Sequence, residues 1–168
     1  MVIISTLNHV CLVVPEGWSH LVSLYKFHGG FKDSRVPEVR HRLPVNAAED
    51  INWWRLCLQR EFLGMRIICP PPPLGNNVYV DASTSWGISL VLDGRWLGWE
   101  FKDNWNSDGR EIGWAEMVAI KLALCTLVVG KFTKCHIIIQ SDNQGLIGVL
   151  KAGRSHGTQQ NLMLHEIV

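Results

Sequence analysis

Short apolar runs separated by turn residues fill the middle of the chain and predict three consecutive strands. The runs span 78–82, 86–92 and 95–101 and contain many β-branched and aromatic residues, as strands of this length usually do. Asp93 and Gly94 separate the second run from the third, and this pair favours a two-residue hairpin turn. The pattern therefore predicts an antiparallel meander.

A longer apolar segment follows the meander. Residues 114–129 carry few polar side chains besides Glu116, which predicts a helix buried on several sides. The run at 134–140 is typical of a central, parallel strand. A meander followed by a helical crossover gives a mixed α/β sheet, with the fourth strand parallel to the first. Two further helices are predicted at 144–152 and 158–168.

The upstream part of the chain has weaker patterns. Residues 7–14 predict a strand because they are rich in β-branched and apolar residues. Apolar positions within 18–27 follow a helical spacing, and Gly29–Gly30 would end that helix. Asp50 is placed to cap a second helix, which Gly64 would close.

Four consecutive prolines, Pro70 to Pro73, mark the clearest boundary in the chain. Such a tract favours extended polyproline II structure and continues neither a helix nor a central strand. We therefore expect three parts along the chain. They are an upstream segment at 1–69, a stiff linker at 70–77 and an α/β domain at 78–168.

The composition is that of a globular protein without strong charge. Hydrophobic residues make up 47% of the 168 residues and charged residues 18%, which argues against intrinsic disorder. The net charge of +1 supplies no overall attraction to nucleic acid. A small basic excess lies upstream, and a solvated loop explains it most simply. It comprises Lys32, Arg35, Arg40, His41 and Arg42.

The numbers and spacing of cysteines and histidines argue against several classes of protein. The five cysteines form no Cys-x-x-Cys pair, and their odd number in a chain without a secretory signal indicates reduced thiols. We therefore expect an intracellular protein, in the cytoplasm or nucleus and not secreted. We also expect no membrane partner, because no stretch approaches the roughly 20 apolar residues of a membrane span. The seven histidines show no His-x3-His pattern, which argues against zinc catalysis.

Asp81, Glu116 and Asp142 are the strongest candidates for chemistry. Neighbouring parallel strands would bring both aspartates to one end of the sheet, where the crossover helix could add Glu116. Clustered carboxylates repel one another unless cations neutralise them, and oxygen ligands suit Mg²⁺ or Mn²⁺. Two such ions roughly 3.5–4 Å apart can activate water and stabilise the leaving oxygen of a phosphodiester. Taken singly, each residue has a plainer explanation, as a capping aspartate, a solvated glutamate or a turn aspartate.

Several segments resemble the ribonuclease H domain of retroelement polyproteins. In that family the strand-one aspartate, the helix glutamate and the strand-four aspartate bind the catalytic metals. The resemblance assigns these roles to Asp81, Glu116 and Asp142. The matching segments are Val80–Ser83, Trp86–Gly87, Trp114–Glu116 and Ser141–Gln144.

The upstream part is similar to the thumb or connection stretch before ribonuclease H in fungal retroelements of the tyrosine-recombinase type. Together the resemblances cover nearly the whole chain. They imply a ribonuclease H-like fold and metal-dependent hydrolysis of the RNA strand of RNA–DNA hybrids, as part of a reverse transcriptase. The implied partners are the hybrid and the remaining polyprotein segments. The upstream matches are Leu7–Val10, Val14–Gly17, Asp50–Trp54 and Phe62–Gly64.

Two departures from the family change the expectation. The paired catalytic aspartates of the polymerase are absent, so we expect no DNA synthesis. The family also has a fourth metal-site carboxylate beyond a fifth strand, whereas the only acid after Asp142 is Glu166, a poor substitute. The chain therefore resembles a domain truncated at its C-terminus, and we expect a weak second metal site.

Lesser candidates surround the carboxylates. Ser83 neighbours Asp81, although hydrogen bonding at the strand end explains it better. Asn143 and Gln144 could donate to 2′-hydroxyl groups, although Asn143 could equally cap the helix that follows. Lys151 and Arg154 could contact phosphates, and a solvated loop is an equal explanation.

Three alternatives to the nuclease remain open. The first is a catalytically inactive nucleic-acid-binding or connection-type module that keeps the fold. The second is an inert, partly folded relic. The third is another member of the same superfold, such as a DNA-strand-transfer nuclease, against which the residues around Asp81 and Asp142 argue.

Overall fold

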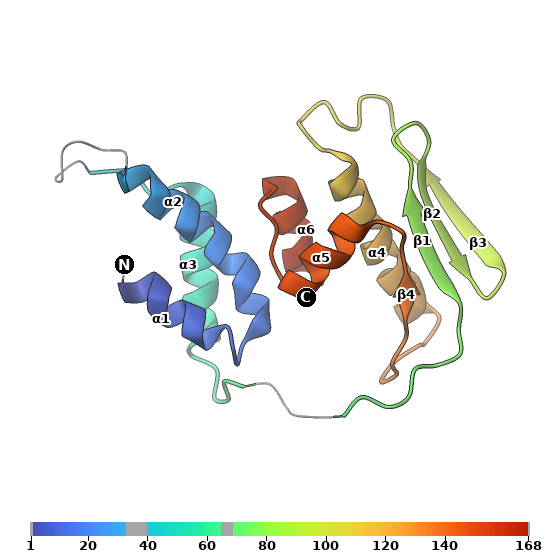
Figure 1. The fold of residues 1–168 in the computed structure, drawn as a ribbon, viewed down its shortest axis with the longest axis horizontal. Coiled ribbons are helices and arrows are strands. Elements are labelled where there is room, and N and C mark those ends of the chain that lie inside the picture. The colour runs from blue at the N-terminus through green and yellow to red at the C-terminus, as the bar shows by residue number, and fades with distance from the viewer. Residues whose placement is uncertain (1, 33–39, 65–68, 168) are drawn as a thin grey trace.

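A mixed four-stranded sheet and six α-helices form the described part of the chain. The computed structural model describes residues 2–32, 40–64 and 69–167. A helical lobe comes first, made of α1 (Val2–Val10), the 3₁₀ helix η1 (Pro15–Leu21), α2 (Val22–Lys32) and α3 (Val45–Cys57). A sheet lobe follows (Figure 1), made of β1 (Val78–Ala82), β2 (Gly87–Leu92), β3 (Arg95–Glu100), α4 (Ile112–Val129), β4 (Ile139–Gln140), α5 (Gln144–Ala152) and α6 (Thr158–Ile167).

The sheet has the topology that the sequence predicts. Its strand order is β3-β2-β1-β4, with antiparallel pairing between β1, β2 and β3 and parallel pairing between β1 and β4. The predicted hairpin turn is present, since Asp93 and Gly94 both adopt positive φ angles, of 49° and 78°. Two positive φ angles twist a tight turn to match the strands that it joins. The expectation of a mixed α/β sheet, with a three-strand meander and one parallel strand, is confirmed.

The fourth strand is shorter than predicted. Only Ile139–Gln140 pairs with β1, whereas the apolar pattern extends over 134–140. Lys134 has a φ of 55°, which interrupts extended structure. The carbonyl of His136 instead accepts a hydrogen bond from the Leu74 amide at 2.8 Å. The start of the run is therefore tied to the proline-rich segment and not to the sheet.

Helix α4 covers the sheet and forms the centre of the core. Its buried face packs on β1 and β2, while α6 packs against it from the other side. Met117 and Ala123 of α4 and Leu164 of α6 are fully buried there.

By length and composition α4 is the one described helix that could cross a membrane, so our expectation that no stretch comes close was too strong. Its core packing explains the apolar composition equally well.

The segment predicted as a strand at 7–14 is helical. Helix α1 and the turn after it bury Leu7 and Cys11, four residues apart, while Leu12 is 69% exposed. That spacing is helical, and the valines at positions 10, 13 and 14 concealed it. Helix α3 approaches η1 closely, because a Cβ on Gly17 of η1 would lie 2.3 Å from the Trp54 ring of α3. Glycine is therefore required at that contact.

The helix boundaries predicted upstream are also wrong. Helix α2 continues through Gly29–Gly30 to Lys32, where we expected it to end. Helix α3 begins at Val45 and ends at Cys57, so Asp50 lies in its interior and Gly64 lies beyond its end. Asp50 is only 5% exposed, and it bonds to η1 and α2 instead of capping a helix. Of the predicted basic cluster, Arg35 lies outside the described residues.

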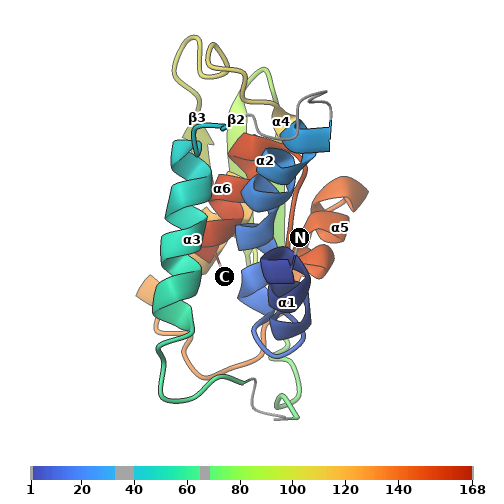
Figure 2. The same ribbon diagram turned by 90° about the vertical axis from the view of Figure 1, so that its left-hand side faces the viewer.

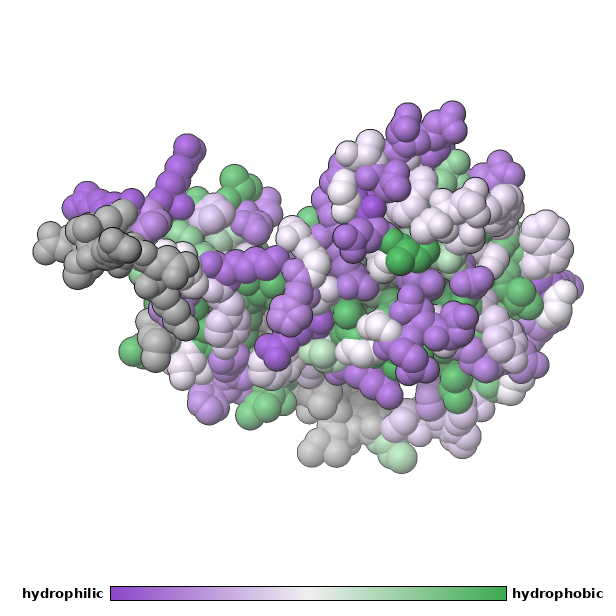
Figure 3. Space-filling model, turned by 45° about the horizontal axis from the view of Figure 1, so that its top comes forward, coloured by the Kyte–Doolittle hydropathy of each residue, from purple (hydrophilic) through white to green (hydrophobic). Residues whose placement is uncertain are grey.

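Helix α6 is shared between the two lobes. In Figures 1 and 2 it lies between the sheet lobe and the helices α2 and α3. The Asn161 side chain donates to the carbonyl of Ser19 at 2.9 Å, and Lys26 donates to the carbonyl of His156 at 3.0 Å. From the side shown in Figure 3 an indentation separates the lobes, and hydrophilic residues form much of its rim. The contact between the lobes, called the seam below, therefore includes polar hydrogen bonds made by Asn161 and Lys26.

Candidate metal centre

The sheet register brings Asp81 and Asp142 together. Tyr79 of β1 pairs with Gln140 of β4 in parallel, and each aspartate lies two residues beyond its member of this pair. Both carboxylates therefore leave neighbouring strands at the same end of the sheet. Helix α4 packs on β1 and adds Glu116 from its first turns. One oxygen from each of the three lies within 4.8 Å of the others, so the predicted convergence is confirmed.

The three carboxylates differ in burial. Asp81 and Asp142 are exposed, whereas Glu116 is only 4% exposed. Its Oε2 is buried and has no hydrogen-bond partner among the described residues. A buried carboxylate oxygen without a donor destabilises the fold. A cation held between the three side chains would supply the missing partner, so this donor set fits a hard divalent ion.

The surroundings of Glu116 hold its side chain closer to neutrality than in water. Burial is the largest cause and raises the pKa of the carboxyl group above its ordinary value of 4.5. A hydrogen bond with Asn143 lowers this pKa, and the negative charges of Asp81 and Asp142 raise it again. The net direction is upward. A cation held between the three carboxylates would therefore compete with a proton for Glu116.

Asn143 connects the metal centre to α5. Its side-chain Oδ1 accepts a hydrogen bond of 2.9 Å from the backbone amide of Leu146, which caps the helix. Its amide nitrogen remains free to donate to Glu116, the bond that lowers the pKa of the carboxyl group. Of the two roles considered for Asn143, the structure shows the cap. A contact with a 2′-hydroxyl group stays a prediction.

Replacing Asn143 with alanine should therefore lower stability. We expect Asn143→Ala to reduce the free energy of unfolding by about 1 kcal/mol, the usual value for a lost N-cap. Urea unfolding in the absence of metal measures this change. Gln144→Ala, at the exposed neighbouring position, is the matched control and should stay within about 0.5 kcal/mol of the parent. Equal effects of the two substitutions would contradict the capping role.

The remaining lesser candidates are exposed at the surface. Ser83 is exposed just after β1 and contacts the Ser85 hydroxyl at 3.1 Å. Gln144 and Lys151 are exposed on α5. The guanidinium of Arg154 lies 5.2 Å from the centre of the Trp18 ring, on the helical lobe. Arg154 thus has a role in joining the lobes, and any contacts of these residues with nucleic acid stay predictions.

Glu166 does not join the metal centre. Its carboxylate pairs with Lys121 of α4, and neither residue belongs to the cluster around Glu116. The sequence-based judgement that Glu166 is a poor fourth ligand agrees with this position. Within the described residues, the centre therefore rests on three carboxylates.

A second cluster of titratable side chains was not predicted. His20, Asp50 and His165 also place ligand-type atoms within 4.8 Å of one another. They come from three separate helices, so no spacing along the sequence could reveal them. The sequence around Asp50 gives no local signal of the cluster, because Asp50 stands among other polar residues and is predicted as a helix cap.

Comparison of the chain with protein-family models, curated protein sequences and solved structures found no match.

Proposed function

We propose that this chain hydrolyses the RNA strand of RNA–DNA hybrids with Mg²⁺ or Mn²⁺ held by Asp81, Glu116 and Asp142. The observation that carries the proposal is the convergence of these carboxylates from β1, α4 and the end of β4. The resemblance to retroelement ribonuclease H domains implies metal ligands at the same three positions. The mixed sheet and its crossover helix agree with that family's fold.

The burial of the three side chains suits this chemistry. Glu116 is enclosed and would hold an ion from within, while Asp81 and Asp142 are exposed and would leave it accessible to a substrate phosphate. Metal ions bound at such a site activate water and neutralise the charge that develops on the phosphodiester. The three carboxylates would hold the ions, and the Asn143 side chain lowers the pKa of Glu116 and so favours its charged form.

The same ligand set limits the expected rate. Three carboxylates provide enough oxygens for one well-held ion but leave a second ion with few protein ligands. Mg²⁺ demands near-ideal octahedral coordination. We therefore propose weak activity that is greater with Mn²⁺ than with Mg²⁺. The net charge of +1 gives little long-range attraction to a hybrid, so we expect hybrid binding to be weak.

The experiment is a cleavage assay on three matched substrates of one sequence. The substrates are an RNA–DNA hybrid with labelled RNA, double-stranded RNA and double-stranded DNA, each with Mn²⁺, Mg²⁺ or EDTA. We expect cleavage of the RNA strand in the hybrid alone, faster in Mn²⁺ and absent in EDTA. Hybrid binding without cleavage in either metal would contradict the proposal and favour a non-catalytic binding module. Cleavage of double-stranded DNA would favour a strand-transfer type of nuclease.

A further inference from the structure

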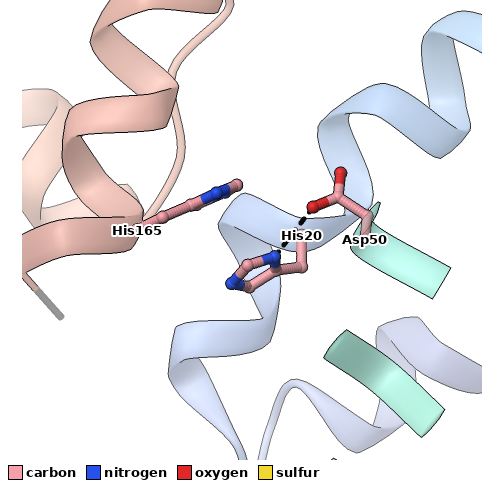
Figure 4. Close-up of side chains that lie close together, drawn as sticks. All are labelled: His20, Asp50 and His165. Carbon is pink, nitrogen blue, oxygen red and sulfur yellow. Dashed lines mark hydrogen bonds and ion pairs between the residues drawn. The ribbon is translucent and has the colours of Figure 1, made fainter. Parts of the chain in front are cut away.

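Three helices bring His20, Asp50 and His165 together at the seam between the lobes. His20 comes from η1, Asp50 from α3 and His165 from α6, as Figure 4 shows. His20 Nδ1 lies 2.8 Å from Asp50 Oδ1, and the two imidazole rings stack with centroids 3.8 Å apart and planes inclined by 21°. The cluster thus joins α6 to the helical lobe through the stacked rings of His165 and His20.

The cluster is held from every side. The Ser23 hydroxyl of α2 donates to the second oxygen of Asp50. Trp53 of α3 stacks on the other face of His20, with centroids 3.9 Å apart. Asn161 Nδ2 of α6 lies 3.3 Å from His165 Nε2. His20 is therefore enclosed between a tryptophan and a second histidine, and both Asp50 oxygens are engaged.

The arrangement is not that of a metal centre. An imidazole binds a metal through a lone pair in the plane of its ring, so rings stacked face to face cannot both direct a nitrogen at one ion. His20 Nδ1 is moreover engaged with Asp50. The neighbouring cavity of about 320 Å³ is lined by His20, Asp50 and His165 among others, but nothing in it defines the chemistry of a ligand.

The charges around the stacked rings accommodate one proton better than two. A proton on His20 would be stabilised by the Asp50 carboxylate at 2.8 Å. A second proton, on His165, would place two positive rings face to face. The other charged groups facing the cluster are Glu49 of α3 and Lys26 of α2, of opposite sign. On the α4 side of α6, Glu166 and Lys121 neutralise each other.

We propose that His20, Asp50 and His165 form a proton-dependent latch between the lobes, closed while the stacked rings share at most one proton and opened by a second. The direction of titration at His165 agrees with this inference. Burial, followed by the charge of His20, lowers the pKa of His165 below its ordinary value of 6.5. The closed state therefore binds fewer protons than the open state below pH 6.5, and it loses stability as the pH falls through that value.

The latch acts on the helix that positions the start of α4. Gln160 Nε2 of α6 donates to the carbonyl of Gly113 at 3.1 Å, three residues before Glu116. Asn161 of the same helix turn donates to the carbonyl of Ser19 in η1. Opening at His165 would therefore loosen η1 from α6 first, while the sheet keeps its own core contacts.

Hydrogen exchange of the whole chain between pH 7.5 and 5.5 tests the latch. We expect protection factors of amides in η1 and α6 to fall towards low pH, by up to about tenfold per pH unit if opening takes up one proton. Protection in β1 and β2 should stay constant. His165→Phe keeps a stacked ring but cannot bind a proton, so it should remove the pH dependence at the seam. His9→Gln, at an exposed position of α1, is the control and should behave as the parent.

A second variant keeps the proposal testable if His165→Phe disturbs the packing against His20. Asp50→Asn retains the size of the side chain and removes the charge that stabilises the first proton, so opening should begin at higher pH. An unchanged opening profile in Asp50→Asn, or equal pH dependence in His165→Phe and the parent, would overturn the latch. Saturable stabilisation by Zn²⁺ at pH 7.5 that both variants abolish would also overturn it, in favour of a metal site.

Discussion

Replacing Asp142 with asparagine should lower hybrid cleavage by more than about 100-fold while the fold persists. The amide keeps the size of the side chain but loses the charge, and the carboxylate is one of only three in the described centre. Loss of residues that merely support a metal ligand typically lowers affinity or activity by about 10–100-fold, so loss of a ligand should exceed that range. Initial rates in saturating Mn²⁺ measure the effect.

An exposed aspartate outside the centre provides the control. Asp103 lies in the loop before α4, and Asp103→Asn makes the same change in charge and size. Its rate should equal that of the parent within about twofold, since a surface change of this kind alters energies by no more than about 0.5 kcal/mol. Comparable losses in the two variants would show that cleavage depends on overall charge and not on the carboxylate centre.

The sheet and its carboxylates could be predicted because each depends on a local signal. The Asp93–Gly94 turn fixes the β2–β3 hairpin, and the buried run of α4 defines the crossover. Once β1 and β4 are neighbours and parallel, the positions of Asp81 and Asp142 at the ends of their strands place them together. The meeting of these carboxylates follows from topology and needs no knowledge of side-chain packing.

The helical lobe could not be predicted in the same way. Residues 7–14 have the β-branched composition of a strand, yet Leu7 and Cys11 pack as one helical face against Trp54. That partner lies about 40 residues away, and tertiary contacts of this kind override local propensity. The sequence predicts Asp50 as a cap because aspartate is a favoured N-cap residue, but the structure buries it in the interior of α3, where a lone carboxylate would be costly. The structure offsets that cost with His20 and Ser23, which the sequence does not link to it.

The His20–Asp50–His165 cluster and the metal centre differ in how completely their buried carboxylate is hydrogen-bonded. At the seam, Asp50 has a partner on each oxygen. At the metal centre, one oxygen of the equally enclosed Glu116 has none within the described residues. Native structures leave few buried polar atoms without partners, and each exception calls for an explanation. The contrast fits a cation-binding role for Glu116 and a complete structural contact at Asp50.

Replacing Glu116 with glutamine should stabilise the metal-free protein. The neutral amide removes a buried charge beside Asp81 and Asp142, and its nitrogen can donate to their carboxylates. We expect the free energy of unfolding at pH 7 in EDTA to rise by about 1–3 kcal/mol, the usual cost of an unsatisfied buried polar group. Urea unfolding measures it. The pKa of Glu116 is raised in the fold, so the parent loses stability as the pH rises above about 4.5, and the variant should lose this dependence.

Bound metal should make the parent more stable than Glu116→Gln. At a Mg²⁺ or Mn²⁺ concentration 1,000 times the dissociation constant, the parent should gain about 4.1 kcal/mol, whereas Glu116→Gln should gain little because it lacks the enclosed ligand. Glu100→Gln, on the exposed edge strand β3, is the matched control and should respond to metal as the parent does. A glutamine variant that is less stable than the parent in EDTA, or equally stabilised by metal, would show that Glu116 is not a ligand of the centre.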